Sequence, residues 1–368
     1  MVGNCELFFN CPHVLEDIRI AGGPRSIYSQ NELRTLSCGN QARDKILWDS
    51  TNNDNTHRPF NIDTESKIAR NNKPGNDAVG DRLPADIQNH PNLRLLPTSC
   101  GAIDGSDRIV GGNLTQLFEM PWMVLLMYDT GLGIEPKCDG TLINEWYVLT
   151  AAHCVTSLPK EYTLKSVVLG EYDMRQDPDC QKFDGKLICA PKIKTVGCEE
   201  IIPHADYDSN SLFDDIALIR LSEPADFSLE SIKPICLPLT QELQKQQLVG
   251  SNAVVAGWGV TESGIQSPVL LSVSVPVVSK EDCQATYSGS VVISDKQLCA
   301  GGVNGRDSCG GDSGGPLMEP GRLGPGRFKS IQRGIVSFGT TQCGTSGYPG
   351  VYTNVAYYMD WILDHMHD

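Results

Sequence analysis

The chain lacks any long apolar run, and none of its segments approaches the length needed to cross a membrane. Residues 1–5 have neither a basic start nor an apolar stretch, so no signal peptide is visible. Basic residues are in the minority, with 30 Lys and Arg against 45 Asp and Glu and a formal net charge of −15. Such a surface repels a phosphate backbone, so we expect no nucleic-acid partner. Because no segment is long and apolar enough to span a membrane, we expect no membrane partner either.

Metal-binding cysteine patterns are absent as well. The sequence has no C-x-x-C motif, and no histidine stands at zinc-ligand spacing beside a cysteine pair. It nevertheless contains 14 cysteines. Because a chain this rich in cysteine usually occupies an oxidising compartment, we predict a secreted, extracellular protein whose signal peptide is not visible in this chain.

Three regions differ in composition. Residues 1–40 contain Cys5, Cys11 and Cys38 around a short apolar cluster. Residues 41–99 are rich in Asn, Asp, Arg and Pro and contain few apolar side chains. They cannot bury enough surface to offset the entropy of ordering, which predicts a mobile linker.

From residue 109 onward, short apolar runs rich in β-branched residues recur between Gly, Pro, Asn and Asp. Examples are residues 123–127, 147–149, 216–219, 253–256 and 334–338. Their brevity predicts the strands of an all-β barrel or sandwich. The chain ends differently, with Val355, Met359, Trp361, Ile362 and Leu363 at the spacing of an amphipathic helix.

One set of polar residues indicates chemistry. Ser313 stands between glycines, in Gly-Gly-Asp-Ser-Gly-Gly-Pro at residues 310–316. A serine hydroxyl is a weak nucleophile that needs a base and backbone N–H donors, and glycines let a tight turn present those donors. His153, in Ala-Ala-His-Cys, is the candidate base, and Asp215, in Asp-Asp-Ile-Ala-Leu, is the candidate acid that orients it. The order His, Asp, Ser is one of the known triad orders.

On these residues, residues 109–368 resemble the trypsin/chymotrypsin family of serine proteases. Further matching segments include residues 108–112 (Arg-Ile-Val-Gly-Gly), 121–122 (Pro-Trp), 256–259 (Ala-Gly-Trp-Gly) and 349–352 (Pro-Gly-Val-Tyr). The resemblance implies two six-stranded antiparallel β-barrels with a C-terminal helix, and an active site in the cleft between the barrels. It implies that Ser313 attacks, His153 moves the proton, Asp215 orients His153, and the N–H groups of Gly311 and Ser313 form the oxyanion hole. Two departures, Asp139 for a common Gly and Asp214 for the usual Asn, remove no catalytic group.

The resemblance also implies a specificity and a switch. Asp307 would lie at the bottom of the primary specificity pocket, Gly339 and Gly350 would form its walls, and Ser308 would add a hydroxyl group. A buried carboxylate is costly unless a cation meets it, so we expect cleavage after Arg or Lys. A cut between Arg108 and Ile109, made by another trypsin-like protease or by this one, would free an ammonium group that pairs with Asp312.

Six disulfides follow from the resemblance: Cys5–Cys38, Cys100–Cys236, Cys138–Cys154, Cys180–Cys189, Cys283–Cys299 and Cys309–Cys343. Cys100–Cys236 would tether the N-terminal piece after cleavage. The resemblance assigns no partner to Cys11 or Cys198. Either these two cysteines pair with each other, or both are free, or the chain is an incomplete product. Glu171 lies where relatives bind calcium, although Lys192 and Lys194 lie across the loop; we expect no required cofactor and leave calcium open.

The spacing of Cys5, Cys11 and Cys38 resembles the middle of a clip domain, and the Cys180–Cys189 loop resembles an insertion in arthropod clip-domain proteases. We therefore expect a partial clip-like module at 1–40, a linker at 41–99, a tethered activation segment at 100–108 and a protease domain at 109–368. The expected function is a secreted zymogen of a serine endopeptidase in an immune, melanization or Toll-type cascade. Its expected partners are protein substrates, an upstream activating protease and a serpin-type inhibitor.

Two other functions share parts of this sequence pattern. A non-catalytic protease homologue could act as a cascade cofactor, but such homologues typically lack the serine, whereas Ser313, His153 and Asp215 are all intact here. A digestive trypsin has a short, disposable propeptide, which the long N-terminal extension and the Cys100–Cys236 tether disfavour.

Overall fold

The computed structural model describes residues 84–102, 113–261, 264–288, 291–303, 311–322, 328–340 and 346–368. They all belong to one compact unit, Val79–Asp368. The predicted module at 1–40 and residues 41–83 of the predicted linker lie outside the described residues.

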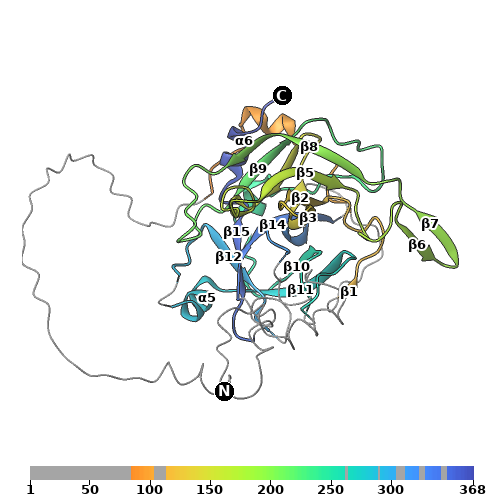
Figure 1. Cartoon of the computed structure of the whole chain (residues 1–368). Coiled ribbons are helices and arrows are strands. Elements are labelled where there is room, and N and C mark those ends of the chain that lie inside the picture. The colour runs from red at the N-terminus through yellow and green to blue at the C-terminus, as the bar shows by residue number, and fades with distance from the viewer. Residues whose placement is uncertain are drawn as a thin grey trace, which may run out of the picture. The chain divides into compact units, whose positions relative to one another are not determined.

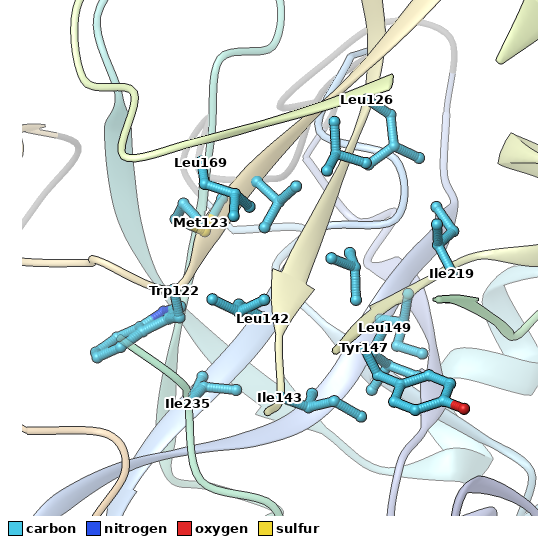
Figure 2. Packing of buried hydrophobic residues seen from close by; sticks show 14 of the residues in the cluster. Trp122, Met123, Leu126, Leu142, Ile143, Tyr147, Leu149, Leu169, Ile219 and Ile235 are labelled. Carbon is cyan, nitrogen blue, oxygen red and sulfur yellow. The ribbon is translucent and has the colours of Figure 1, made fainter. Parts of the chain in front are cut away.

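Six strands close a first β-barrel in the order β2-β3-β4-β9-β8-β5, with every pair antiparallel. They are β2 (Met123–Asp129), β3 (Ile134–Leu142), β4 (Tyr147–Thr150), β5 (Thr163–Leu169), β8 (Lys194–Pro203) and β9 (Ala217–Leu221). Apolar side chains of different strands, among them Leu126, Leu142, Leu149 and Ile219, gather inside this barrel (Figure 2). Their burial supplies most of the driving force that holds the barrel closed.

A second barrel follows in the chain. Its strands pair in the order β11-β10-β13-β14-β15-β12, and β12 pairs back to β11, which closes it. They are β10 (Asn252–Gly257), β11 (Leu271–Val278), β12 (Gln297–Ala300), β13 (Pro316–Gly321), β14 (Lys329–Phe338) and β15 (Gly350–Asn354), and the short β1 (Asn113–Leu114) pairs with β11 at the edge. The predicted fold of two six-stranded antiparallel barrels is confirmed (Figure 1).

Helices are few and short in the described residues: η2 (Pro91–Leu95), η3 (Ala152–Cys154), α4 (Gln241–Gln244), α5 (Lys280–Thr286) and α6 (Met359–Asp364). The predicted C-terminal helix is confirmed as α6, which buries Met359, Ile362 and Leu363. None of the helices in these ranges has both the length and the apolar character to cross a membrane.

The last part of the predicted linker is not a mobile spacer. Ile87 and Leu96 join the core around the first barrel, with exposures of 1% and 8%. Asn92 Nδ2 donates hydrogen bonds of 2.9 Å to the carbonyl oxygens of Leu363 and Met366, so this segment lies beside α6 (Figure 1). The linker prediction is wrong for these residues because their few apolar side chains meet a ready apolar surface on the protease domain.

Strands β6 (Cys180–Phe183) and β7 (Lys186–Cys189) form a separate two-stranded sheet that projects from the barrels (Figure 1). The Cys180–Cys189 disulfide closes its base. Every residue of β7 is exposed to solvent.

Candidate active site

His153 and Asp215 meet on the first barrel. His153 lies in η3, directly after β4, and Asp215 lies just before β9, the strand that pairs with β4. The imidazole Nδ1 lies 2.8 Å from Asp215 Oδ2, and the backbone N–H of His153 donates to Asp215 Oδ1 over 2.9 Å. The carboxylate is fully buried, whereas the imidazole remains 23% exposed. The two bonds fix the orientation of the ring and leave Nε2 on its outer side.

The second barrel supports the same aspartate. Ser337 Oγ, on β14, donates a hydrogen bond to Asp215 Oδ2. Thr353 Oγ1, on β15, donates to the backbone carbonyl oxygen of Asp215 over 2.7 Å. The sequence patterns did not indicate either residue, although a polar Ser337 inside the apolar run 334–338 is a signal for a buried hydrogen-bond donor. The buried carboxylate is thus held from both barrels, as a buried charge requires.

Ser313 lies on the turn that leads into β13, between the two barrels. Its carbonyl oxygen accepts a hydrogen bond of 2.8 Å from the backbone N–H of Asp139, on β3. Gly314 has a positive φ of 80°, and a Cβ there would collide with Thr150 Oγ1 and the carbonyl oxygen of Asp139. Glycine therefore lets the serine turn approach the end of β4, from which the chain passes directly to His153.

The structure does not join the serine hydroxyl to the imidazole by a hydrogen bond. His153 Nε2 instead lies 3.6 Å from Cys154 Sγ, a sulfur that belongs to the Cys138–Cys154 disulfide. Catalytic hydrogen bonds commonly tighten only in the substrate complex. The fold thus brings the serine turn and the His153–Asp215 pair to the same junction between the barrels, but it does not form the hydrogen bond between Ser313 and His153.

The turn before the serine is fixed to the segment after β10. Gly311 has a φ of 102°, and a Cβ there would lie 3.0 Å from Gly259 Cα. Asp312 Oδ1 accepts a hydrogen bond of 2.8 Å from the backbone N–H of Gly259. Both contacts require glycine, which explains the Gly residues around Trp258 and Ser313 in the sequence.

Asp139, one of the two departures from the family pattern, is only 1% exposed. Burial and the neighbouring negative charge of Asp312 hold the pKa of its carboxyl group well above the usual range. Its Oδ2 has no hydrogen-bond partner among the described residues. The raised pKa favours the protonated form of Asp139, which lessens the repulsion between its carboxyl group and that of Asp312 beside the serine turn.

The predicted walls of the specificity pocket lie next to each other. Gly339 follows β14 and Gly350 begins β15, and a Cβ on Gly339 would lie 3.8 Å from Gly350 Cα. Several other predicted site residues lie outside the described residues: Asp307, Ser308, Arg108, Ile109, Cys5, Cys38, Cys309 and Cys343.

Four disulfides occur among the described residues, and they are the pairs that the resemblance implies: Cys100–Cys236, Cys138–Cys154, Cys180–Cys189 and Cys283–Cys299. Cys138–Cys154 joins β3 to η3 beside His153.

Cys198 is a free, half-buried thiol. Burial raises its pKa to about 11, so the thiol stays protonated and unreactive at neutral pH. Cys11, its proposed partner, lies outside the described residues.

Glu171 is poorly placed to hold calcium. Asp173 binds Arg175 with both carboxylate oxygens, and both oxygens of Asp179 accept backbone N–H groups. Within the described ranges, the one group of three potential ligands whose atoms converge within 4.8 Å is Cys138, His153 and Cys154, two of which form a disulfide. Because Ca²⁺ needs six or more oxygen ligands, these carboxylates do not fit the ion as they stand.

Two antiparallel barrels with a His–Asp pair and a serine turn at their junction define the chymotrypsin-like class of folds. The chain belongs to the trypsin family, whose sequence model, described as "Trypsin", matches residues 109–362.

Its relatives are insect clip-domain serine proteases. The chain is 45% identical to "CLIP domain-containing serine protease HP8" of Bombyx mori, over 73% of this chain and 72% of the relative. It is 43% identical to "Phenoloxidase-activating factor 3" of Holotrichia diomphalia, over 72% of this chain and 74% of the relative. Among solved structures it resembles the Drosophila Grass clip serine protease of the Toll pathway. That match has a TM-score of 0.66 and 38% identity and covers 76% of this chain and 77% of the other.

Proposed function

We propose that the chain is the zymogen of a serine endopeptidase, activated by cleavage between Arg108 and Ile109, which cuts protein substrates after Arg or Lys. One observation carries the proposal: the buried Asp215 orients His153 at the junction of the barrels, beside the turn that bears Ser313. This arrangement suits acyl transfer through a serine nucleophile.

The chemistry follows from the three side chains. Ser313 Oγ attacks the scissile carbonyl carbon while His153 Nε2 takes the hydroxyl proton. The C–N bond then breaks, and the imidazolium gives that proton to the leaving amine. Asp215 keeps Nδ1 protonated and stabilises the imidazolium, and the N–H groups of Gly311 and Ser313 bind the oxyanion. Water repeats the sequence and releases the acyl group from Ser313. No cofactor is required.

Specificity and activation rest on two carboxylates. Asp307 offers a negative charge to an Arg or Lys side chain, and small residues at Gly339 and Gly350 leave room for it. Asp312 receives the ammonium group of Ile109 after the cut, with Gly259 already holding one of its oxygens. The pairing exists only in the cut form, so the ordered substrate pocket is favoured only then.

The relatives support a role in an extracellular cascade. Their names include "Melanization protease 1" and "Spaetzle-processing enzyme", both from Drosophila melanogaster. We propose an analogous secreted enzyme of innate immunity, with an upstream activating protease, protein substrates and a serpin-type inhibitor as partners. The four disulfides of the described residues are consistent with an oxidising compartment.

The test is to cut the full chain after Arg108 and profile peptide substrates, with Ser313→Ala as the matched inactive variant. We expect turnover of Arg and Lys substrates, a drop of at least about a thousandfold in Ser313→Ala, and little activity in the uncut chain. Absence of turnover by the correctly cut wild type would instead support the non-catalytic cofactor.

A further inference from the structure

The carboxyl group of Asp214 stands directly before the catalytic aspartate, and the two barrels share it. Asp214 is buried, with 6% exposure. Lys296, the residue before β12 of the second barrel, places its Nζ 2.7 Å from Asp214 Oδ1. Tyr358 Oη, at the start of α6, donates to the same oxygen over 2.8 Å.

The backbone at this position is unusual. Asp214 has a φ of 57°, in the left-handed region that Asn and Asp enter more readily than other residues. Its carbonyl oxygen accepts a hydrogen bond of 2.9 Å from the N–H of Ile216, so the short turn encloses Asp215. A displacement of the Asp214 side chain would therefore move the peptide that carries the triad aspartate.

The other groups near Asp214 do not neutralise it. Tyr358 is a neutral donor, since burial, the first cause, raises its pKa far above the usual range. His204 lies edge-on to Tyr358 at a ring distance of 5.6 Å, but burial lowers its pKa, which leaves it uncharged at neutral pH. The Tyr357 ring, whose centroid is 5.8 Å from Lys296 Nζ, faces the ammonium group instead. Lys296 supplies the compensating positive charge.

We propose that Lys296 and Asp214 are positioning residues of the triad: their ion pair between the barrels fixes the turn that carries Asp215 and cancels a second negative charge beside it. The role of this pair in catalysis rests on the proposed protease function. Without the lysine, an unpaired carboxylate adjoins Asp215, and the added negative charge stabilises the protonated form of His153. A protonated imidazole cannot act as the base, so activity near neutral pH falls.

A double-mutant cycle in the cut enzyme tests this proposal. Lys296→Met removes the charge and keeps the length of the side chain. Asp214→Asn removes the opposite charge, tolerates the left-handed backbone and keeps an oxygen for Tyr358. We expect Lys296→Met to lower kcat/KM about tenfold at pH 7. The acid limb of the pH dependence of kcat/KM should move to higher pH in this variant, by about half a unit or more. The double variant should regain most of the lost kcat/KM, and its acid limb should return close to the wild-type position. Lys296→Arg, which keeps the positive charge, should keep near-normal activity.

The matched control is Lys280→Met. Lys280 pairs with Asp295, next to Lys296 in the chain, in an ion pair that does not reach the triad. This variant should stay within about twofold of wild type. A Lys296→Met variant that behaves like Lys280→Met would overturn the proposal. A loss that Asp214→Asn does not restore would also overturn it, because it would show that charge balance is not the reason.

Two further measurements keep the outcomes distinct. If Lys296→Met fails to fold, the double variant, which buries no unpaired charge, is compared with Asp214→Asn alone. The lysine left unpaired in Asp214→Asn should place the acid limb of its activity profile at lower pH than that of the double variant, and matching profiles would contradict the proposal. If the cut wild type turns over no substrate, the proposed function fails. The titration of the His153 ring protons by NMR, assigned with His153→Ala, still tests the pair without turnover. Its midpoint should rise in Lys296→Met and return in the double variant, and an unchanged midpoint would contradict the inference.

Discussion

Glu171, on the turn after β5, shows how burial changes the charge of a single carboxyl group. Burial is the main cause that raises its pKa to about 7, and the negative charges of Asp179, Asp173 and Asp177 add to it. The folded state therefore binds this proton more tightly than the unfolded state. Its stabilising contribution is complete below about pH 4.5, the ordinary value for the group, and is lost as the pH rises towards about 7.

Replacement of Glu171 by Gln should remove this pH dependence. We expect the variant to gain stability relative to the wild type as the pH rises from 4.5 to 8, because the wild type alone must ionise a half-buried group. Thermal unfolding across that range measures it, with both chains carrying Ser313→Ala to prevent self-digestion. The exposed Glu223→Gln is the control and should follow the wild type. A rise in melting temperature on adding millimolar Ca²⁺, lost in Glu171→Gln, would contradict our view of this site.

The segment around η2 is the clearest case at the scale of an element. Ile87 is 1% exposed and belongs to the core around the first barrel. Asn144 Nδ2 donates to the carbonyl oxygen of Leu95 over 3.0 Å, and Gln88 Nε2 donates to that of Leu239 over 2.8 Å. This segment precedes the protease domain in the sequence, but it packs as part of that domain.

Ile87→Ala should therefore destabilise the protease domain itself. The loss of a fully buried isoleucine costs about 2–5 kcal/mol in a well-packed core. Chemical denaturation followed by tryptophan fluorescence measures it. The matched control is Ile265→Ala, since Ile265 is 67% exposed and should change stability by less than about 0.5 kcal/mol. Equal effects from the two substitutions would show that the segment does not pack against the domain in solution.

At the scale of the whole molecule, the Cys100–Cys236 disulfide and the packed segment hold the N-terminal piece in two independent ways. After a cut at Arg108, we expect both pieces to migrate together on a denaturing gel without reductant and to separate with it. The double substitution Cys100→Ser and Cys236→Ser should separate them on that gel even without reductant. The pieces of this variant should still co-elute in native gel filtration, because Ile87, Asn92 and Leu96 keep their contacts. Release of the N-terminal piece under native conditions would assign the attachment to the disulfide alone.

Much of this arrangement could be predicted from the sequence, because the determining signals are local. Short apolar runs between turn residues gave the strands, and the amphipathic spacing from Met359 to Leu363 gave the terminal helix. The motifs around His153, Asp215 and Ser313 indicated the site through a family resemblance. The pairing of Cys100 with Cys236 also came from that resemblance, since cysteine spacing alone leaves the connectivity open.

Other features depend on contacts between residues far apart in the chain, and only the tertiary structure decided them. Ser337 and Thr353 reach Asp215 from the second barrel, and Lys296 reaches Asp214 across the same junction. Residues 84–99 have a composition typical of a linker, yet a few apolar side chains bind a surface formed by distant strands and by α6. A sequence lists the side chains that can be buried or ion-paired, but the closing of two barrels against each other decides which partners they meet.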